Sequence, residues 1–339
     1  MNAAAAWGVG AVGLISSAFG WVQAPREFFA AWLAGFLILA AWPLGSLGLL
    51  LAHAMTGGRW GVALRLPLMS GVSVMVLLIP AAVPLGFGLS TLYPWFGRQA
   101  PIAGFYLNAD FFTVRAAIYA LVWLGLAGAA LRRGGTRKRL APLGALLLAY
   151  SVTFAMIDLA QSLTPGFQSS VFGLLAMAGM AGFGLAAALA AAVLAKIPLP
   201  PAAGRLLFAL VLLWAYLEFI QALIVWESDL AAEAPWYLAR STGPWGMLAW
   251  ILAAGHFLLP FFLLLSGRQQ KRESTILGVA LLLLAMEILR WWWVVLPSLS
   301  MRPGWIDFAV IAGLGGSSIG LVLATRGRLR SWCGEVADG

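Results

Sequence analysis

The sequence predicts an all-α integral membrane protein of about ten transmembrane helices, and three features carry this prediction. Of the 339 residues, 62% are hydrophobic and only 10% are charged, a balance that soluble globular domains do not show. The mean hydropathy is +0.93. The apolar residues form runs of roughly 20, the length that an α-helix needs to cross about 30 Å of hydrocarbon with its backbone hydrogen bonds closed internally.

Ten apolar runs lie between polar breaks. They are residues 4–22, 28–53, 66–89, 111–131, 140–162, 169–195, 205–226, 244–265, 275–296 and 304–325. The first has the length of a signal peptide, but no basic region precedes it and a second span follows directly, so we interpret it as a helix. Pro80, Pro84 and Pro260 should bend the third and eighth helices. Glycines between residues 173 and 184 favour close packing of the sixth.

The loops are too short for a second fold, so residues 1–330 are predicted to form one polytopic membrane domain, followed by a short cytoplasmic tail at 331–339. Lys and Arg are retained in cytoplasmic loops, and here they favour one side by 15 to five. The first side carries Arg59, Arg65, Arg132, Arg133, Arg137, Lys138, Arg139, Lys196, Arg205, Arg268, Lys271, Arg272, Arg326, Arg328 and Arg330. The other side carries Arg26, Arg98, Arg115, Arg240 and Arg302.

This charge distribution places both termini in the cytoplasm. It also accounts for the formal net charge of +9. The basic composition therefore indicates topology and requires no nucleic-acid partner.

Residues that bind metals or haem are scarce. The chain has a single cysteine, Cys333, and two histidines. His53 lies at the cytoplasmic end of the second span and His256 lies near the middle of the eighth, so they cannot ligate one haem from both sides. We expect this chain to bind no metal or haem of its own.

Three titratable residues fall in one layer of the predicted membrane. At about 1.5 Å per residue, Glu218 and Glu287 lie roughly 18 to 20 Å from the cytoplasmic end of their helices, and His256 lies near mid-depth. Ionisable groups inside a span are costly and are functional candidates by default. We interpret them as candidates for a proton path across the membrane.

Each acid has a neighbour on the same helical face that can donate hydrogen bonds: Gln221 for Glu218, and Arg290 for Glu287. The alternative for the second pair is mutual neutralisation inside a bundle, which makes Glu287 the structural partner and Glu218 the better carrier.

Asp158, near the outer end of the fifth span, is a further candidate for the proton path. It lies close to a helix C-terminus, where the helix dipole disfavours an anion. The outer loops near 90–110 and 227–243 are rich in aromatic residues, which either form an interfacial belt or contact partner subunits. The candidates for partner contact are Tyr93, Trp95, Trp236, Tyr237 and Arg240.

Several segments together resemble a known family. The first half contains His53–Gly61 (HAMTGGRWG), Leu92–Trp95 (LYPW), Tyr106–Asn108 (YLN), Asp110–Phe112 (DFF), Arg115 and Tyr119, then Asp158, Ser162–Leu163, Pro165, Ser169 and Phe172–Gly173. The second half contains Phe219, Gln221, Trp226, Glu233, Trp236–Tyr237, Arg240, His256–Phe262 (HFLLPFF) and Lys271. Over about residues 28 to 300 this pattern resembles the second quinone-binding subunit, the F subunit, of alternative complex III.

The resemblance implies a polysulfide-reductase-type membrane subunit with two four-helix bundles and flanking helices, in the bacterial inner membrane. It implies a role in a quinol oxidoreductase that reduces cytochrome c or another periplasmic acceptor. Haem c and iron-sulfur clusters would lie in partner subunits, next to a homologous polytopic subunit. Lipid would surround this chain, and the resemblance is compatible with a bound quinone. Two alternatives stay open: a stand-alone secondary transporter and a purely structural membrane anchor.

Overall fold

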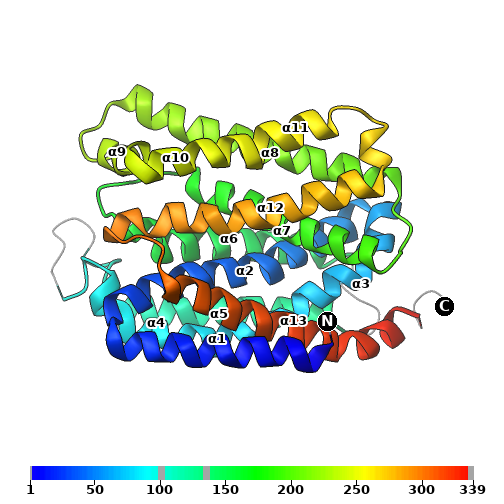
Figure 1. The fold of residues 1–339 in the computed structure, drawn as a ribbon, viewed down its shortest axis with the longest axis horizontal. Helices are drawn as coiled ribbons and strands as arrows, with labels where there is room; N and C mark the ends of the chain where they lie inside the picture. Colours follow the sequence, from blue (N-terminus) through cyan, green and yellow to red (C-terminus); the bar gives the residue numbers. More distant parts are fainter. Residues whose placement is uncertain (1, 98–103, 133–137, 335–339) are drawn as a thin grey trace.

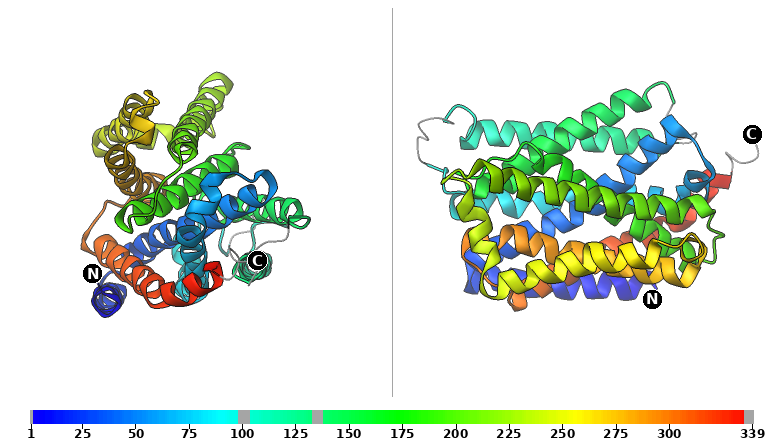
Figure 2. Two further views of the ribbon diagram at one scale, coloured as in Figure 1. Left: turned by 90° about the vertical axis from the view of Figure 1, so that its right-hand side faces the viewer. Right: turned by 90° about the horizontal axis from the view of Figure 1, so that it is seen from above.

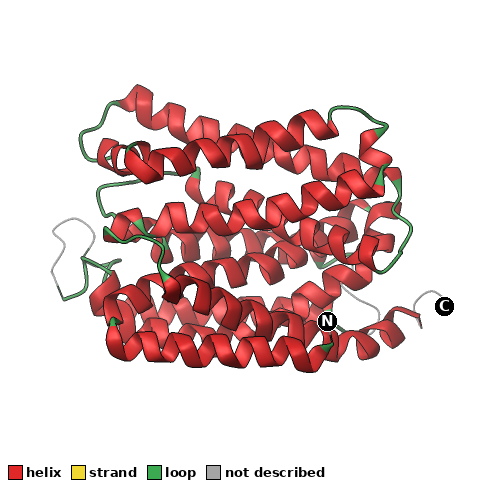
Figure 3. Ribbon diagram, viewed as in Figure 1, coloured by secondary structure: helices red, strands yellow, loops and turns green. Residues whose placement is uncertain are grey.

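The structure, a computed structural model, describes residues 2–97, 104–132 and 138–334. These residues form helices and connecting turns, with no strand among them (Figure 3). Ten helical segments are long and apolar enough to cross a membrane, which confirms the predicted fold class. Of the basic residues counted above, Arg98, Arg133 and Arg137 lie outside the described residues, as do residues 335–339 of the tail.

The observed spans agree with the predicted runs to within a few residues at most ends, and to within seven at the start of the third. They are α1 (Ala3–Gln23), α2 (Pro25–Thr56), α3 with α4 (Arg59–Ser73 and Leu78–Leu92), α5 (Ala109–Ala130), α6 (Ala141–Leu159), α7 (Phe172–Leu194), α8 (Pro201–Ser228), α10 with α11 (Gly243–Leu252 and Leu259–Leu264), α12 (Glu273–Val295) and α13 (Trp305–Gly334). A short helix, α9 (Ala234–Ser241), precedes α10. Because α13 continues to Gly334, the helix extends past the predicted start of the tail.

Two of the three predicted prolines, Pro80 and Pro260, follow interruptions of their spans, whereas Pro84 lies inside α4. A proline has no N–H and its ring clashes with the carbonyl four residues earlier. A 3-10 turn at Val74–Leu77 joins α3 to α4 and includes the residue four positions before Pro80. A π-helical turn at Ala253–Leu258 joins α10 to α11 and includes His256, four positions before Pro260. Pro260 thus accounts for the irregular backbone around a predicted functional residue.

The spans pack as two bundles with a flanking pair. Helices α2 to α6 form the first bundle and α7, α8 and α10 to α12 form the second, with α2 and α7 in contact at the centre (Figures 1 and 2). The two central helices approach closely: a Cβ on Gly184 of α7 would lie 2.6 Å from the backbone nitrogen of Ser46 on α2. The glycine-rich sixth span therefore brings the bundles together, as its composition predicts.

Helices α1 and α13 lie side by side along the outside of the bundles (Figure 1). Gly13 packs against the backbone of Gly313, and a Cβ on Gly316 would lie 2.5 Å from the backbone nitrogen of Gly10. Small residues on both helices allow this close approach. The first and last described residues lie toward the same end of the molecule, as an even number of spans requires (Figure 1). We call this the basic end, because the loops predicted to be cytoplasmic lie there, and the other the outer end.

Candidate functional site

The second bundle contains a cavity of about 350 Å³ that gathers most of the predicted site. It lies between α8, the α10 segment and α12, with α9 at one end. Its polar lining consists of Glu218, Tyr237, Arg240, Ser241 and Arg290, and the rest is apolar and aromatic. Sequence reasoning placed Glu218, Glu287 and His256 in one layer on three helices; the structure brings all three to or next to this cavity.

Glu287 and Arg290 form a buried ion pair on α12. Arg290 donates from Nη2 to Oε1 at 2.6 Å and from Nε to Oε2 at 2.8 Å, a two-point geometry that orders both side chains. A Cβ on Gly179 of α7 would lie 3.0 Å from Arg290 Nη2 and from Glu287 Oε1, so the glycine leaves room for the pair. The i,i+3 neighbours predicted from sequence therefore neutralise each other.

His256 is buried next to the cavity and stacks on Trp214 of α8. The ring centroids are 3.8 Å apart and the rings are almost parallel, at 7°. Its Nδ1 atom is buried and has no hydrogen-bond partner within the part of the chain that the structure describes. A buried polar atom of this kind is costly. The histidine is therefore held by packing and keeps an unused hydrogen-bonding atom.

Glu218 lines the cavity and is partly exposed to it. Its carboxyl group forms no hydrogen bond and no ion pair within 4 Å with any residue that the structure describes. The expectation that Gln221 donates to it is wrong. Gln221, a turn further along α8, accepts from Ser169 Oγ at 3.0 Å and donates to the Tyr237 hydroxyl at 3.4 Å, which uses its amide.

Arg240 closes the outer end of the cavity, and no carboxylate of the described residues pairs with it. Its guanidinium donates to the carbonyl oxygens of Trp236, Trp293 and Val294 and to Ser298 Oγ, at 2.6 to 3.0 Å. It also lies 3.8 Å above the Trp236 ring. Burial lowers the pKa of Arg240 to about 9, which leaves it protonated at neutral pH. Its acceptors include the last carbonyls of α12, where a cation complements the helix dipole.

Asp158 lies in the first bundle, apart from this cavity. Arg115 donates to its two oxygens at 2.8 and 3.0 Å, and the Tyr119 hydroxyl donates to Oδ2 at 2.7 Å. Asp158 lines a separate cavity of about 230 Å³ between α2, α4, α5 and α6. The sequence analysis did not identify Arg115 as its partner. An anion near a helix C-terminus is disfavoured by the helix dipole, so a neighbouring cation could have been expected.

The last helices of the two bundles end alike. Ser162 Oγ donates to the Asp158 carbonyl at 2.6 Å after α6, and Ser298 Oγ donates to the Val294 carbonyl at 3.4 Å after α12. An arginine binds each of these ends, Arg115 in the first bundle and Arg240 in the second. Asp158, whose carboxylate pairs with Arg115, therefore corresponds to Val294 in the second bundle.

The outer aromatic residues are mainly internal. Tyr93, Trp95, Trp236 and Arg240 are each at most 3% exposed, and Tyr237 is half-buried. Tyr93 donates to the Leu159 carbonyl, and Trp95 donates to Ser162 Oγ. Their polar atoms are used to fasten loops onto helix ends, so a partner at this face would touch other residues. Phe105, Trp226 and Leu238, in or beside the two outer loops, are exposed large apolar side chains, at 62 to 85%.

No cluster of three or more His, Cys, Asp or Glu residues that could hold a metal ion occurs among the residues described. No known protein-family model matches the chain, and a comparison with curated proteins finds no significant match. The chain is a multi-pass integral membrane protein. Its resemblance to a family remains a prediction from sequence, and its finer function is proposed below from the cavity in the second bundle.

Proposed function

We propose that the chain is a membrane subunit, without redox centres of its own, of a quinol oxidoreductase of the alternative complex III type that reduces cytochrome c or another periplasmic acceptor. In that complex it anchors the other subunits and contributes protonatable groups to a path across the membrane. The observation that carries the proposal is the position of Glu218, an acid without an ion-pair partner among the described residues, at a cavity between transmembrane helices.

The chemistry of the three acids separates their roles. A carboxyl group in an apolar environment favours its neutral, proton-bearing form, whereas a nearby arginine favours the ionised form. Glu287 has such an arginine in Arg290, and Asp158 has one in Arg115. Glu218 forms no ion pair with any described residue, although Arg290 lines the same cavity and its charge acts on Glu218. It is therefore the acid that faces a cavity without being fixed by an ion pair, and we assign it the binding and release of the proton. His256, beside Trp214, supplies a second titratable group in the same layer.

A secondary transporter is the competing function, and the interrupted helix around His256 is the feature that favours it. Transporters place broken helices and ionisable residues near the middle of the membrane, and the π-helical turn at Ala253–Leu258 is such a break. Pro260 gives this turn a local cause, however. The respiratory function requires partner subunits that carry redox centres, whereas a transporter requires none.

Affinity purification of the tagged full-length chain from native membranes tests the proposal. We expect an assembly that contains c-type haem, with its absorption bands, and non-haem iron, both retained through a second, orthogonal purification step. A chain that elutes alone or as a dimer, with neither haem nor iron, contradicts the respiratory function and favours the transporter.

A further inference from the structure

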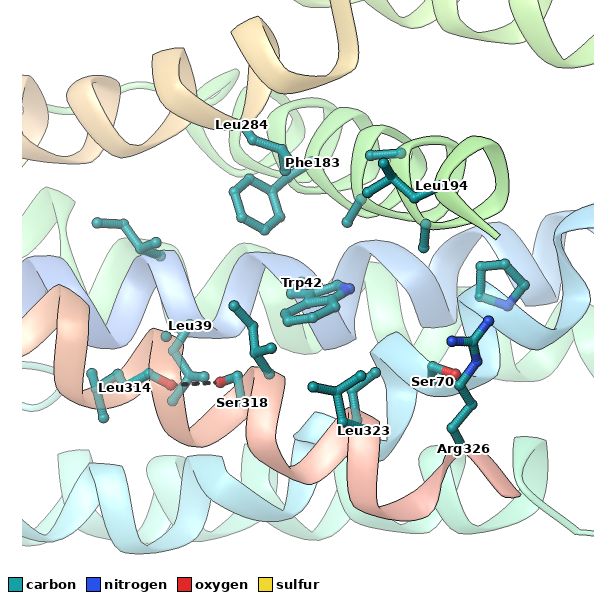
Figure 4. A pocket seen from close by; sticks show the side chains of 18 of the residues that line it. Leu39, Trp42, Ser70, Phe183, Leu194, Leu284, Leu314, Ser318, Leu323 and Arg326 are labelled. Atoms are coloured by element: carbon teal, nitrogen blue, oxygen red, sulfur yellow. Dashed lines mark hydrogen bonds between the residues drawn. The ribbon is translucent and has the colours of Figure 1, made fainter. Parts of the chain in front are cut away.

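A long apolar groove runs between the two bundles and α13 toward the basic end (Figure 4). It has a volume of about 580 Å³ and is lined by residues of α2, α3, α7, α12 and α13, together with the residues that follow α7. Its wall is almost entirely aliphatic and aromatic, and Arg326 is the one charged residue among the described residues that line it. The serines in it, Ser70 and Ser318, donate to carbonyls of their own helices at 2.8 and 2.7 Å. The groove therefore offers its occupant an apolar surface.

The dimensions of the groove match one leaflet of a bilayer. Ile311 and Arg326 both line it and lie about 15 residues apart on α13, or about 22 Å along the helix. A bilayer with its headgroup regions is about 40 to 45 Å thick, so one leaflet takes about 20 to 22 Å, and a groove of this length reaches from near mid-membrane to the headgroup region at the basic end. Arg326 lines the groove at that end, next to Ser70 (Figure 4).

A second cation stands at the same end in an unusual backbone conformation. Lys196 has φ +55, a left-handed conformation that side chains other than glycine rarely adopt. It follows α7 in a Schellman motif, in which the backbone nitrogens of Lys196 and Ile197 donate to the carbonyls of Val193 and Ala192. Glycine is the usual residue at this position. Lys196 is exposed, and its neighbours Ala195 and Ile197 both line the groove.

We propose that this groove binds an acyl chain of an anionic phospholipid, whose phosphate lies between Lys196 and Arg326 at the basic end. The apolar lining accommodates the chain, and the two cations select the charge of the headgroup. Gly315 contributes to the depth of the groove, because a Cβ there would meet no atom within 4 Å. The proposal is independent of the function proposed above, since it uses none of the residues around Glu218.

Lipid binding to the purified full-length chain, measured by native mass spectrometry, tests the site. The probes are phosphatidylglycerol and phosphatidylcholine with the same acyl chains. We expect phosphatidylglycerol to bind more tightly, and Lys196→Gly and Arg326→Gln each to lower its affinity about fivefold, the effect of removing one cation near an anionic headgroup. Neither variant should change binding of phosphatidylcholine. Lys196→Gly relieves the left-handed conformation, so loss of folding cannot explain its effect.

A groove-filling variant tests binding of the acyl chain separately from binding of the headgroup. Gly315→Leu adds a side chain inside the groove and should weaken both lipids, whereas Gly125→Leu is the matched control. Gly125 also has no atom within 4 Å of an added Cβ, but it is on α5 and outside the groove. Equal affinity for the two lipids, or undiminished phosphatidylglycerol binding to Gly315→Leu, overturns the proposal. So does a native assembly in which a helix of another subunit, rather than lipid, fills the groove.

Discussion

Arg290 binds Glu287 through two hydrogen bonds of 2.6 and 2.8 Å, and both side chains are at most 3% exposed. Removal of one member of a buried ion pair leaves the other charge unpaired, which costs about 3 to 5 kcal/mol. Replacement of both residues by neutral side chains of similar size costs much less, because no charge then has to be buried.

Glu287→Gln should therefore impair folding and assembly. We expect little chain in the membrane, or a thermal unfolding midpoint in detergent that is lower by several degrees. The control is Glu273→Gln, an exposed acid in the first turn of the same helix, which should behave as wild type. The double variant Glu287→Gln/Arg290→Met should recover stability. A double variant as unstable as Glu287→Gln would contradict the explanation that an unpaired Arg290 charge causes the loss.

The sequence indicates contacts between neighbours on one helix better than contacts with residues from other segments. Arg290 follows Glu287 by one helical turn, so the geometry of the helix alone indicates their contact. The same rule wrongly pairs Gln221 with Glu218, because Tyr237 and Ser169 offer the amide better partners from outside the helix. Helical spacing shows which residues share a face, but packing decides which of them bind.

Contacts between residues of different helices could be identified only in the folded structure. Arg115 is 43 residues from Asp158, and Arg240 is 53 from Trp293, so no periodicity connects them. The ten spans, in contrast, follow from composition, because each must hold its apolar length within the bilayer. The burial of Trp236 and Arg240 could not be read from an aromatic, polar loop, which in most membrane proteins indicates an exposed interface.

Asp158→Asn should lower stability without altering proton transfer. Both carboxylate oxygens are bound, by Arg115 and by the Tyr119 hydroxyl, so the group is fixed in the first bundle. We expect a lower unfolding midpoint and, in assembled complex, unchanged protons per electron. Reduced proton stoichiometry in an assembled Asp158→Asn complex would show instead that this residue belongs to the path.

The packing of α1 on α13 gives a stability prediction with a matched control. A Cβ at Gly13 would clash with the backbone of Gly313, so Gly13→Val should destabilise the chain by about 1 to 3 kcal/mol. Gly8→Val makes the same change on the same helix, where nothing lies within 4 Å of the new Cβ. Thermal unfolding of both variants in detergent checks this, and equal midpoints contradict the observed contact.

Topology follows from the distribution of Lys and Arg. Reporters fused after Arg139, Gln270 and Gly339 should indicate a cytoplasmic position, although Gly339 lies outside the described residues. Reporters at Gly97 and Ala234 should indicate the periplasm. The measurement is paired alkaline phosphatase and fluorescent-protein activity at each site, and reversal at two or more sites overturns the orientation.

The most direct test of the proposed function is the number of protons translocated per electron by the purified complex with Glu218→Gln, reconstituted in vesicles. Glutamine keeps the size of the side chain but cannot carry a proton. The control is Glu227→Gln, an exposed acid at the end of the same helix. We predict that both complexes assemble and oxidise quinol at near wild-type rates, and that Glu218→Gln alone translocates fewer protons per electron. An assembled Glu218→Gln complex with unchanged proton stoichiometry would contradict the account.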